Sequence, residues 1–366
     1  SLLTSWRLIT ERVAVYHGLI LILLGALIGA FASLDVVLFY VFFESTLAPA
    51  FFLIGLFGGP ERRRASLIFV IYTLAGSLLT LLGVISLISV LYQHTNPHVI
   101  TFSFAQLTES LSTLNWREWH ETASWSSPQV WIFLLLLAGF AVKLPLFPFH
   151  TWLPLTYGQA PTPVTMLLAG VMSKLGAYGL IRLTLAMTPL GAEAMFPWTT
   201  TLAVVGILYG AYVALAQTNL KALVTYSSLS HMGFIALGLF ALNATGIHGA
   251  TVQMVNHGIT TAALFACVCM LEQRYGTSSV LQLGGLWAKL PTWTFFLFIA
   301  ALGSVALPGL NGFVGEFPIL AGMFGASKLA GTLAALGMIV GAYYLIGMLK
   351  DVVFGPLREP QTLVGS

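Results

Sequence analysis

The chain has 366 residues, of which 58% are hydrophobic and 7% are charged, whereas soluble domains carry roughly 25% charged residues. This composition excludes a soluble globular domain, and the net charge of +3 comes from scattered residues that form no basic patch for nucleic acid. The composition instead predicts a multi-pass membrane protein. About 20 apolar residues suffice to cross a bilayer, and about ten such segments fit in this chain.

The predicted fold is all-α, with about ten transmembrane helices. We place them at residues 15–33, 36–57, 65–92, 129–150, 161–187, 198–217, 221–242, 247–271, 291–326 and 329–354. The one long loop, 93–128, ends in a stretch with Trp116 and Trp119, which is typical of an interfacial segment. The chain begins at Ser1 without a signal peptide or an initiator methionine, so we expect it to be part of a longer chain.

The fourth predicted helix carries Lys143 near its middle, followed by Pro145 and Pro148. A lysine at the centre of a membrane helix costs about 2.5–3.5 kcal/mol, so it normally has a partner and a function. The prolines cannot donate backbone hydrogen bonds, and we therefore expect the carbonyls of Ala141 and Leu144 to lose their helical partners. A helix broken at this depth is tolerated where it is buried in protein or lines a wet cavity. The segment indicates an ion path.

The ninth predicted helix, 291–326, is too long for one simple crossing and contains Pro308, Gly309, Asn311 and Gly312 in its middle. This segment is the fourth of the second group of five predicted helices. The broken helix with Lys143 is likewise the fourth of the first group of five. With five helices in a run, the second run starts from the opposite face of the membrane. This pattern predicts two inverted five-helix repeats with function at the broken helices. We divide the chain into residues 1–190, which include the loop 93–128, and residues 191–366.

Lysine and arginine residues predict the orientation of the chain. Ten crossings put ten basic residues on one side and three on the other, with Lys143 and Lys174 inside the membrane; the ten are Arg7, Arg12, Arg62, Arg63, Arg64, Lys221, Arg274, Lys289, Lys350 and Arg358, and the three are Arg117, Arg182 and Lys328. The basic side, with the Arg62–Arg64 loop, is expected to face the cytoplasm or its equivalent.

Glu44 lies about a third of the way along the second predicted helix. A partner lysine would keep both groups charged, whereas desolvation alone would favour their neutral forms. Glu44 and Lys143 are therefore candidates for a switchable proton site, in which separating the two releases the lysine's proton. The alternative is a static ion pair that only supports the structure.

Lys174, in the fifth predicted helix, has no acid nearby in the sequence, and a lone buried lysine titrates readily. His150, His231 and His257 lie within or just past predicted membrane helices, and histidine passes protons well near neutral pH. Glu316 follows the ninth-helix break and is the natural terminal acid of a relay. The alternatives are a lysine that snorkels or caps a carbonyl, and histidines that are hydrogen-bonded core residues.

No stretch resembles a nucleotide-binding loop, a haem ligand pair or an iron–sulfur cysteine set, and the chain is expected to carry no redox cofactor or metal. Cys267 and Cys269 lie two residues apart on one predicted helix and point in different directions, so we predict neither a disulfide nor a metal site for them.

Six stretches together resemble one family: FYVFFESTLAPAFFLIGLFGG, FAVKLPLFPFHTWLPLTYGQAPT, LLAGVMSKLGAYGLIR, YSSLSHMGF, VQMVNHGITTAALF and LPGLNGFVGEFPIL. They are similar to the antiporter-like subunits of respiratory complex I, the NADH:quinone oxidoreductase. Pro49, five residues after Glu44, and the ending MLKDVVFG favour the NuoM type, whose mitochondrial counterpart is NADH dehydrogenase subunit 4. The resemblance covers nearly the whole chain.

The resemblance implies fourteen helices with two inverted five-helix repeats at the centre, of which this chain would hold the core. By motif, it implies Glu44 and Lys143 as the coupled pair, Lys174 as central proton carrier and Glu316 as distal acid, with His231 and His257 between them. It implies a translocase driven by quinone reduction elsewhere, so that NAD, FMN, iron–sulfur clusters and quinone belong to partner subunits. The expected partners are other membrane-arm subunits and the redox arm, in a bacterial inner membrane or an equivalent energy-transducing membrane.

One stretch departs from the family pattern. After HTWLP the family usually reads Asp-Ala-His, where this chain has Leu155, Thr156 and Tyr157. Any role of that acid or histidine is absent here, and a proton input route through this loop would be altered.

Three other readings share some of these features. A subunit of a Mrp-type cation/proton antiporter or of a membrane-bound hydrogenase would carry the same motifs. A purely structural subunit would conduct nothing, and the buried charges Glu44, Lys143, Lys174 and Glu316 argue against it, because apolar residues would pack at lower cost.

Overall fold

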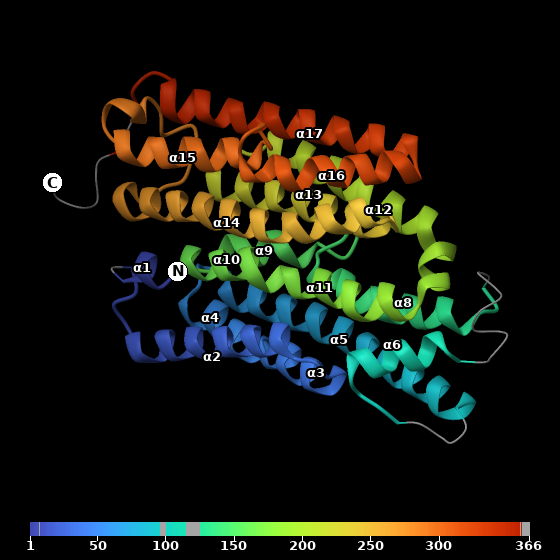
Figure 1. Ribbon diagram of the computed structural model, residues 1–366. Coiled ribbons are helices and arrows are strands. Elements are labelled where there is room, and N and C mark those ends of the chain that lie inside the picture. Colours follow the sequence, from blue (N-terminus) through green and yellow to red (C-terminus); the bar gives the residue numbers. More distant parts are fainter. Residues whose placement is uncertain (7, 96–99, 115–124, 359, 361–366) are drawn as a thin grey trace.

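The computed structural model describes residues 1–366 except 7, 96–99, 115–124, 359 and 361–366 (Figure 1). Four residues of the sequence predictions therefore lie outside the described residues: Arg7, Trp116, Arg117 and Trp119. The described part is helical, and its only β-type pairings are isolated bridges, such as the one between Asp35 and Ser103.

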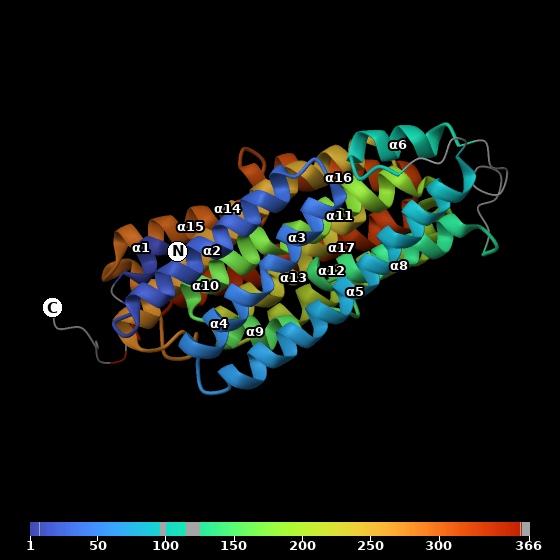
Figure 2. The same ribbon diagram turned by 90° about the horizontal axis from the view of Figure 1, so that it is seen from below.

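The helices run roughly along one axis and form an elongated bundle (Figures 1 and 2). The N-terminal half contains α1 (Leu2–Ser5), α2 (Val13–Ala32), α3 (Val36–Ser45), α4 (Leu47–Phe57), α5 (Arg62–His94), α6 (Phe104–Ser112), α8 (Pro128–Lys143), α9 (Trp152–Gln159), α10 (Thr162–Leu167), η1 (Leu168–Met172), α11 (Ser173–Gly179) and η2 (Leu180–Leu185). The C-terminal half contains α12 (Pro189–Leu215), α13 (Leu220–Phe240), α14 (Ala244–Tyr275), η3 (Leu286–Ala288), α15 (Pro291–Ser304), α16 (Asn311–Ala326), α17 (Lys328–Leu349) and η4 (Lys350–Phe354).

Eight helical stretches of the described residues are long and apolar enough to cross a membrane, and they make the chain a multi-pass membrane protein. They are Val13–Ala32, Val36–Phe57, Arg62–His94, Thr162–Leu185, Pro189–Leu215, Leu220–Phe240, Ala244–Tyr275 and Lys328–Phe354. Each overlaps one of the segments expected from the sequence. The loop 93–128 between α5 and α8 is not structureless, because it contains the short helix α6.

The fourth and ninth expected segments are each two shorter helices. The fourth consists of α8 and α9, separated by residues 144–151, and the ninth of α15 and α16, separated by residues 305–310. In the second interruption Gly309 has a φ of 95°, a conformation that favours glycine because it has no Cβ. Both interruptions lie where the sequence places Leu-Pro pairs.

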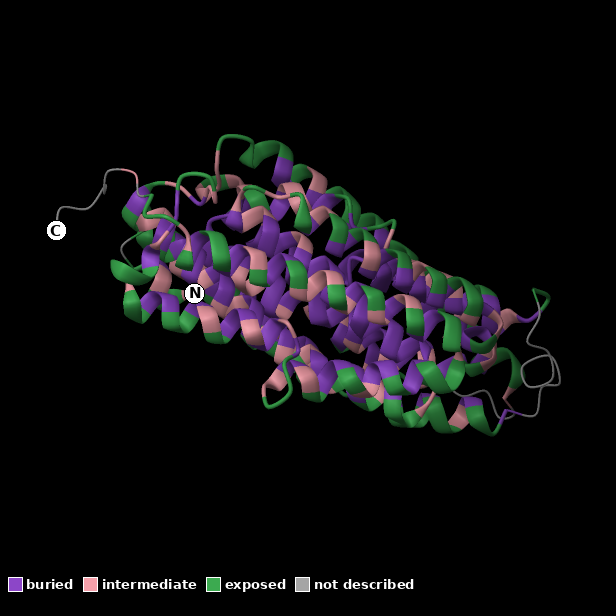
Figure 3. Ribbon diagram, turned by 90° about the horizontal axis from the view of Figure 1, so that it is seen from above, coloured by how far each residue is buried: buried purple, intermediate pink, exposed green. Residues whose placement is uncertain are grey.

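The interior of the bundle centres on α13. In the 18-residue apolar window of this helix, 94% of the residues are buried, against 33% in the window of α2. Helix α13 packs against α12 and α14, α14 against α16, and α5 against α8. Buried residues fill the interior of the bundle and exposed residues lie along its outside (Figure 3). Large apolar residues are among the exposed ones, such as Val255 (63% exposed) and Ile339 (65% exposed). Such an outward apolar face is what a bilayer covers.

Candidate functional site

Lys143 is the last residue of α8, and its ammonium group lies where α3 ends and α4 begins. Nζ donates to the Phe43 carbonyl at 2.9 Å and to Thr46 Oγ1 at 3.2 Å. It also lies 3.4 Å from the centroid of the Phe43 ring, a cation–π distance. Lys143 is only 2% exposed, so a carbonyl, a hydroxyl and an aromatic face hold its amino group inside the protein.

Glu44 follows Phe43 in α3 and is half-buried. Its Oε1 atom is enclosed and has no hydrogen-bond partner. Among the described residues no ion pair within 4.0 Å joins Glu44 to Lys143. The two expected partners are therefore neighbours across the α3–α8 contact, but the lysine is bonded to the backbone carbonyl next to the acid rather than to the acid itself.

At the α8–α9 interruption, donors from outside the helical pattern bind two backbone carbonyls of α8. The Ala141 carbonyl, which loses the donor that Pro145 lacks, accepts from the Leu146 N–H at 2.8 Å instead. The Val142 carbonyl accepts from the indole Nε1 of Trp152 at 3.0 Å. The Ala141 carbonyl has thus lost its helical partner, as expected, and the chain supplies a replacement donor five residues later.

Lys174 lies in α11 between the π-helical turns η1 and η2, and it is 4% exposed. Its Nζ is 2.6 Å from His257 Nδ1, on α14. It also donates to the Ala169 carbonyl at 2.6 Å, so it does cap a carbonyl as well as contact a titratable group. The wider π-helical turn frees backbone carbonyls of the α-helical pattern, and such turns occur often at functional sites.

His231 of α13 and Glu316 of α16 form a buried pair, with Nδ1 2.6 Å from Oε1. The other ring nitrogen, Nε2, is 3.0 Å from Ser304 Oγ at the end of α15. Gln253 of α14 donates from Nε2 to Glu316 Oε1 at 2.9 Å. The α15–α16 interruption thus brings Ser304 and Glu316, twelve residues apart in sequence, onto the same imidazole.

The two pairs meet at the histidines. The ring centroids of His231 and His257 are 5.6 Å apart, close enough for the rings to touch. Four ionisable side chains from four different helices therefore form one line, which we name the buried row: Lys174, His257, His231 and Glu316. The sequence predicted all four residues, and the fold brings them together.

The row also fixes donor and acceptor roles. If Lys174 is an ammonium, His257 Nδ1 must accept, which leaves Nε2–H to donate to Thr261 Oγ1 at 3.0 Å. If Glu316 is a carboxylate, His231 donates to it from Nδ1. A proton that leaves Lys174 finds an acceptor nitrogen at once, and each later group can either accept or donate.

The sequence did not predict three polar groups that support the row: Gln253, Thr261 and Ser304. Gln253 and Thr261 lie four residues before and after His257, one helical turn away on the same face of α14, and this spacing could have revealed them. Ser304 ends α15 directly before the interruption. Asn256 and Asn311 fix the start of α16 from α14, since Asn256 Nδ2 donates to the Asn311 carbonyl at 2.6 Å.

His150 and the unusual stretch after it lie apart from the row. The His150 ring is buried between Phe147 and Tyr209, with centroids 5.3 and 4.9 Å away, and its Nδ1 has no partner. Thr156 donates to the Trp152 carbonyl at 2.8 Å, and the enclosed Tyr157 hydroxyl has no partner. No contact among the described residues links His150 directly to Lys143 or to the row.

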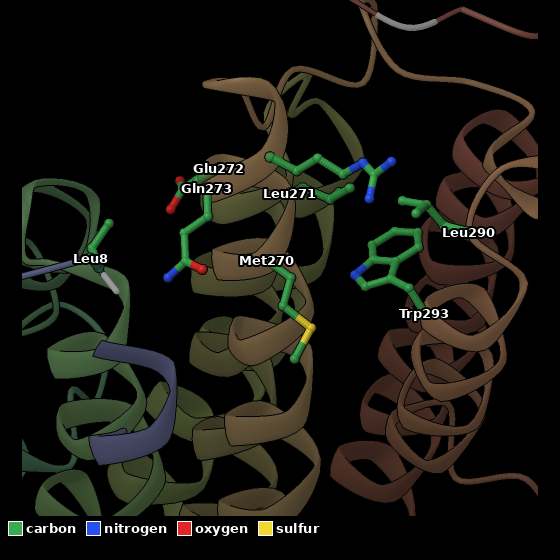
Figure 4. A pocket seen from close by; sticks show the side chains of 8 residues that line it. Leu8, Met270, Leu271, Glu272, Gln273, Leu290 and Trp293 are labelled. Carbon is green, nitrogen blue, oxygen red and sulfur yellow. The ribbon is translucent and has the colours of Figure 1, made fainter. Parts of the chain in front are cut away.

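Cavities reach the bundle at several points. One of about 570 Å³ lies at the C-terminal end of α14, where Figure 4 shows Glu272 and Gln273 on the side of Leu8 and Trp293 on the other side. None of the predicted site residues lines it. A second of about 480 Å³, lined by Lys174 among mostly apolar residues, lies between α10–α11 and α14. In the described part of the chain, no three His, Cys, Asp or Glu residues gather as a metal site would need.

Comparisons with known proteins identify the family of this chain. The sequence profile of the family described as NADH:quinone oxidoreductase/Mrp antiporter, transmembrane, matches residues 33–341. The chain belongs to this family. It is 40% identical to NADH-quinone oxidoreductase subunit M of Rhodobacter capsulatus over 98% of this chain and 68% of that protein. Subunit M of Pseudomonas aeruginosa is 36% identical over 100% of this chain and 70% of that protein.

Solved structures agree in fold. A chain of respiratory complex I from Thermus thermophilus with bound NADH superposes with a TM-score of 0.85 and 33% identity, over 96% of this chain and 71% of that one. A chain of the Mrp complex from a Dietzia species superposes with a TM-score of 0.80 at 23% identity, over 93% of this chain and 60% of that one. At this identity the second likeness shows the fold alone.

Proposed function

We propose that this chain is a proton-translocating membrane-arm subunit of an NADH:quinone oxidoreductase, and that protons move through it along the buried row. The observation that carries the proposal is the row of four buried ionisable groups. Lys174 meets His257 at 2.6 Å, His231 meets Glu316 at 2.6 Å, and the ring centroids of the two histidines are 5.6 Å apart. Buried charges in a membrane are expensive and mark ion pathways. The relationship to subunit M supports complex I over an antiporter or a hydrogenase.

Each member of the row has a distinct task. Lys174 is the central carrier, because its Nζ lies within hydrogen-bond distance of His257 Nδ1, which can take its proton. The two histidines pass the proton on, since an imidazole accepts at one nitrogen and releases from the other. Glu316 is the terminal acid, steadied by Gln253 and by His231.

Glu44 and Lys143 form the driving element in this proposal, with His150 as an additional relay residue. In the conformation seen here Lys143 is held by the Phe43 carbonyl. A movement of Glu44 toward Lys143 would keep the lysine protonated, and its withdrawal would release the proton. Because charges inside a low-dielectric interior act over longer distances than in water, this change biases the charge state of Lys174.

The larger organisation follows from the same proposal. Residues 1–190 and 191–366 are two inverted five-helix repeats, each with one interrupted segment in fourth place; the separation of α8 from α9 and of α15 from α16 supports this. The side with Arg62–Arg64 faces the cytoplasm of a bacterial inner membrane or its equivalent. Electron transfer through NAD, FMN, iron–sulfur clusters and quinone belongs to partner subunits of the complex.

Lys174→Met tests the proposal in the intact complex. Methionine keeps the length and apolar stem of lysine but carries no proton, so we expect NADH-driven proton pumping to fall by about tenfold or more, in line with the loss of one proton-transfer group. Lys328→Met is the control, because Lys328 is exposed at the start of α17. Pumping is measured as acidification of sealed membrane vesicles, together with NADH oxidation. Full pumping by the Lys174 variant would support a subunit that only fills the membrane.

A further inference from the structure

A cavity of about 430 Å³ lies between the C-terminal parts of α12 and α17 and the start of α13. Its lining mixes polar and charged groups with apolar ones, among them Gln217, Tyr344, Lys350 and Asp351. Lys350 and Asp351 are exposed at its rim. Lys350 is one of the basic residues that we assign to the cytoplasmic face. The cavity is therefore suited to hold water that is continuous with that face.

Tyr344 lines the cavity and connects it to the protein interior. The residue is 3% exposed, and its hydroxyl donates to Ser227 Oγ at 2.8 Å, a bond that joins α17 to α13. Its neighbour Tyr343 is 71% exposed and points away from the interior. A buried tyrosine hydroxyl that bonds another side-chain hydroxyl, rather than a carbonyl, keeps a chain of exchangeable protons intact.

Ser227 is the next hydroxyl group in this hydrogen-bonded series, toward the buried row. It lies four residues before His231 on α13, so the two side chains are neighbours on one face of the helix. Ser230, by contrast, donates its hydroxyl proton to the Ile207 carbonyl at 2.9 Å. Among the described residues Ser227 gives its own proton to no carbonyl, so this proton remains available for transfer.

Glu316 offers a free acceptor oxygen. Its Oε1 atom accepts from His231 and Gln253, whereas Oε2 accepts from none of the described residues. Glu316 is bonded to His231, which lies one helical turn after Ser227 on α13. Water between Ser227 and Oε2 would complete the connection, as bridging waters commonly do.

We propose that Tyr344 and Ser227 form a proton inlet from this cavity to Glu316, separate from the path through Lys174. A hydronium ion in the cavity protonates the Tyr344 oxygen as the phenolic proton passes to Ser227 Oγ. The Ser227 proton passes, through the intervening water, to Glu316 Oε2. Both hydroxyls end neutral and turn to reset the chain, so the net event is one proton moved from cavity to carboxylate. This inlet rests on the proposed function and gives the row a second point of loading.

The first test removes each hydroxyl without changing the packing. Tyr344→Phe and Ser227→Ala should each slow NADH-driven pumping by about threefold or more, with residual transfer carried by water. The double variant should be no slower than the worse single variant, since both groups serve one route. Tyr212→Phe and Ser230→Ala are the matched controls, because Tyr212 is 61% exposed on α12 and Ser230 donates to a backbone carbonyl. Normal pumping by Tyr344→Phe or Ser227→Ala would overturn the inlet.

The second test blocks the cavity in the assembled complex. Gly347 lines it and has no atom within 4 Å of the position of an added Cβ, so Gly347→Cys introduces a thiol without a clash. A charged, membrane-impermeant methanethiosulfonate reagent should then slow pumping by about threefold or more when it is applied to the basic face. The parent chain is the control, because Cys267 and Cys269 are buried. Complete modification, verified by mass, with unchanged pumping would overturn the inlet.

These results separate the inlet from the proposed function. Loss of pumping in Lys174→Met together with normal pumping in both hydroxyl variants would leave the function standing and reject the inlet. Normal pumping in Lys174→Met would reject the function first, whatever the hydroxyl variants do.

Discussion

The buried row and the Glu44–Lys143 region use the same kinds of residue in different ways. In the row each ionisable side chain touches another: Lys174 meets His257, His231 meets Glu316, and the two imidazole rings touch. In the other region the ammonium of Lys143 is bound to the Phe43 carbonyl and Thr46, and Glu44 stands apart with an unpartnered oxygen.

We propose that the row conducts protons and that the Glu44–Lys143 region controls the conduction. A proton on Lys174 has a titratable neighbour within hydrogen-bond distance, so it can move without a rearrangement of helices. A proton on Lys143 faces the Phe43 carbonyl, which cannot take it, and the Thr46 hydroxyl, which donates its own proton to that same carbonyl. It can therefore move only if the lysine side chain swings or Glu44 approaches. We therefore expect the row to depend on the identity of each group, and the Glu44–Lys143 region to depend on movement.

The largest effect is expected from breaking the row in its middle. His257→Leu keeps the side-chain volume approximately but removes both ring nitrogens, so Lys174 and His231 lose the link between them. Proton pumping should fall by about tenfold or more, as expected for the loss of a proton-transfer group. The measurement is vesicle acidification by the intact complex, with complex assembly checked by native electrophoresis.

His248→Leu is the matched control for this substitution. His248 is exposed near the start of the same helix, so its variant should pump normally. Normal pumping by His257→Leu would contradict the row as a conductor and leave its contacts with a structural role only.

Lys143→Met tests the driving element formed by Glu44 and Lys143. The substitution should lower proton pumping while the stability of the complex stays nearly unchanged. The Phe43 carbonyl keeps a hydrogen bond after the substitution, because Thr46 Oγ1 also donates to it at 2.7 Å. No buried charge is left behind in the variant unless Glu44 is ionised. We expect the thermal midpoint of the solubilised complex to change little, corresponding to less than about 1 kcal/mol, while pumping falls severalfold.

Thr46→Val provides the comparison for Lys143→Met. It removes a hydroxyl from the same cluster and leaves the ammonium on the carbonyl, so pumping should persist. Equal loss of stability and of pumping in both variants would show instead that Lys143 acts as a structural support for the α3–α4 junction.

The sequence predicted the four members of the row, because charged and imidazole side chains in apolar helices are rare and easily recognised. It predicted the first interruption from two prolines, and the second from a proline and glycines in the middle of an over-long segment. It could not predict that Lys143 binds the Phe43 carbonyl, because that contact joins residues 100 positions apart and depends on how α3 and α8 pack.

Ordinary polar residues were the harder part of the site. Gln253, Ser304 and Tyr344 look like any polar residue of a helix until the fold places them against His231, Glu316 or Ser227. The replacement donor for the Ala141 carbonyl was missed for a related reason, since prolines show which helical donor is missing but not which donor replaces it. Periodicity gives faces of helices, whereas hydrogen-bond partners come from the assembled bundle.

The smallest predicted effect concerns Tyr157, in the half-helix that follows the first interruption. Its hydroxyl is enclosed and has no partner, and the ring lies near Trp152 and Phe265. An unpaired buried hydroxyl costs free energy, so Tyr157→Phe should raise the stability of the complex by about 1 kcal/mol and leave pumping unchanged. Thermal unfolding of the solubilised complex, followed by loss of NADH oxidation, measures the change.

Thr156→Val is the comparison variant, because it should change the stability of the complex in the opposite direction. Thr156 is just as buried, but its hydroxyl donates to the Trp152 carbonyl, so valine should lower the stability by about 1 kcal/mol. A Tyr157→Phe variant that loses stability or pumping would show that the hydroxyl binds water and takes part in transfer. In that case the region around the first interruption would conduct protons as the row does, and the contrast between the two regions would not hold.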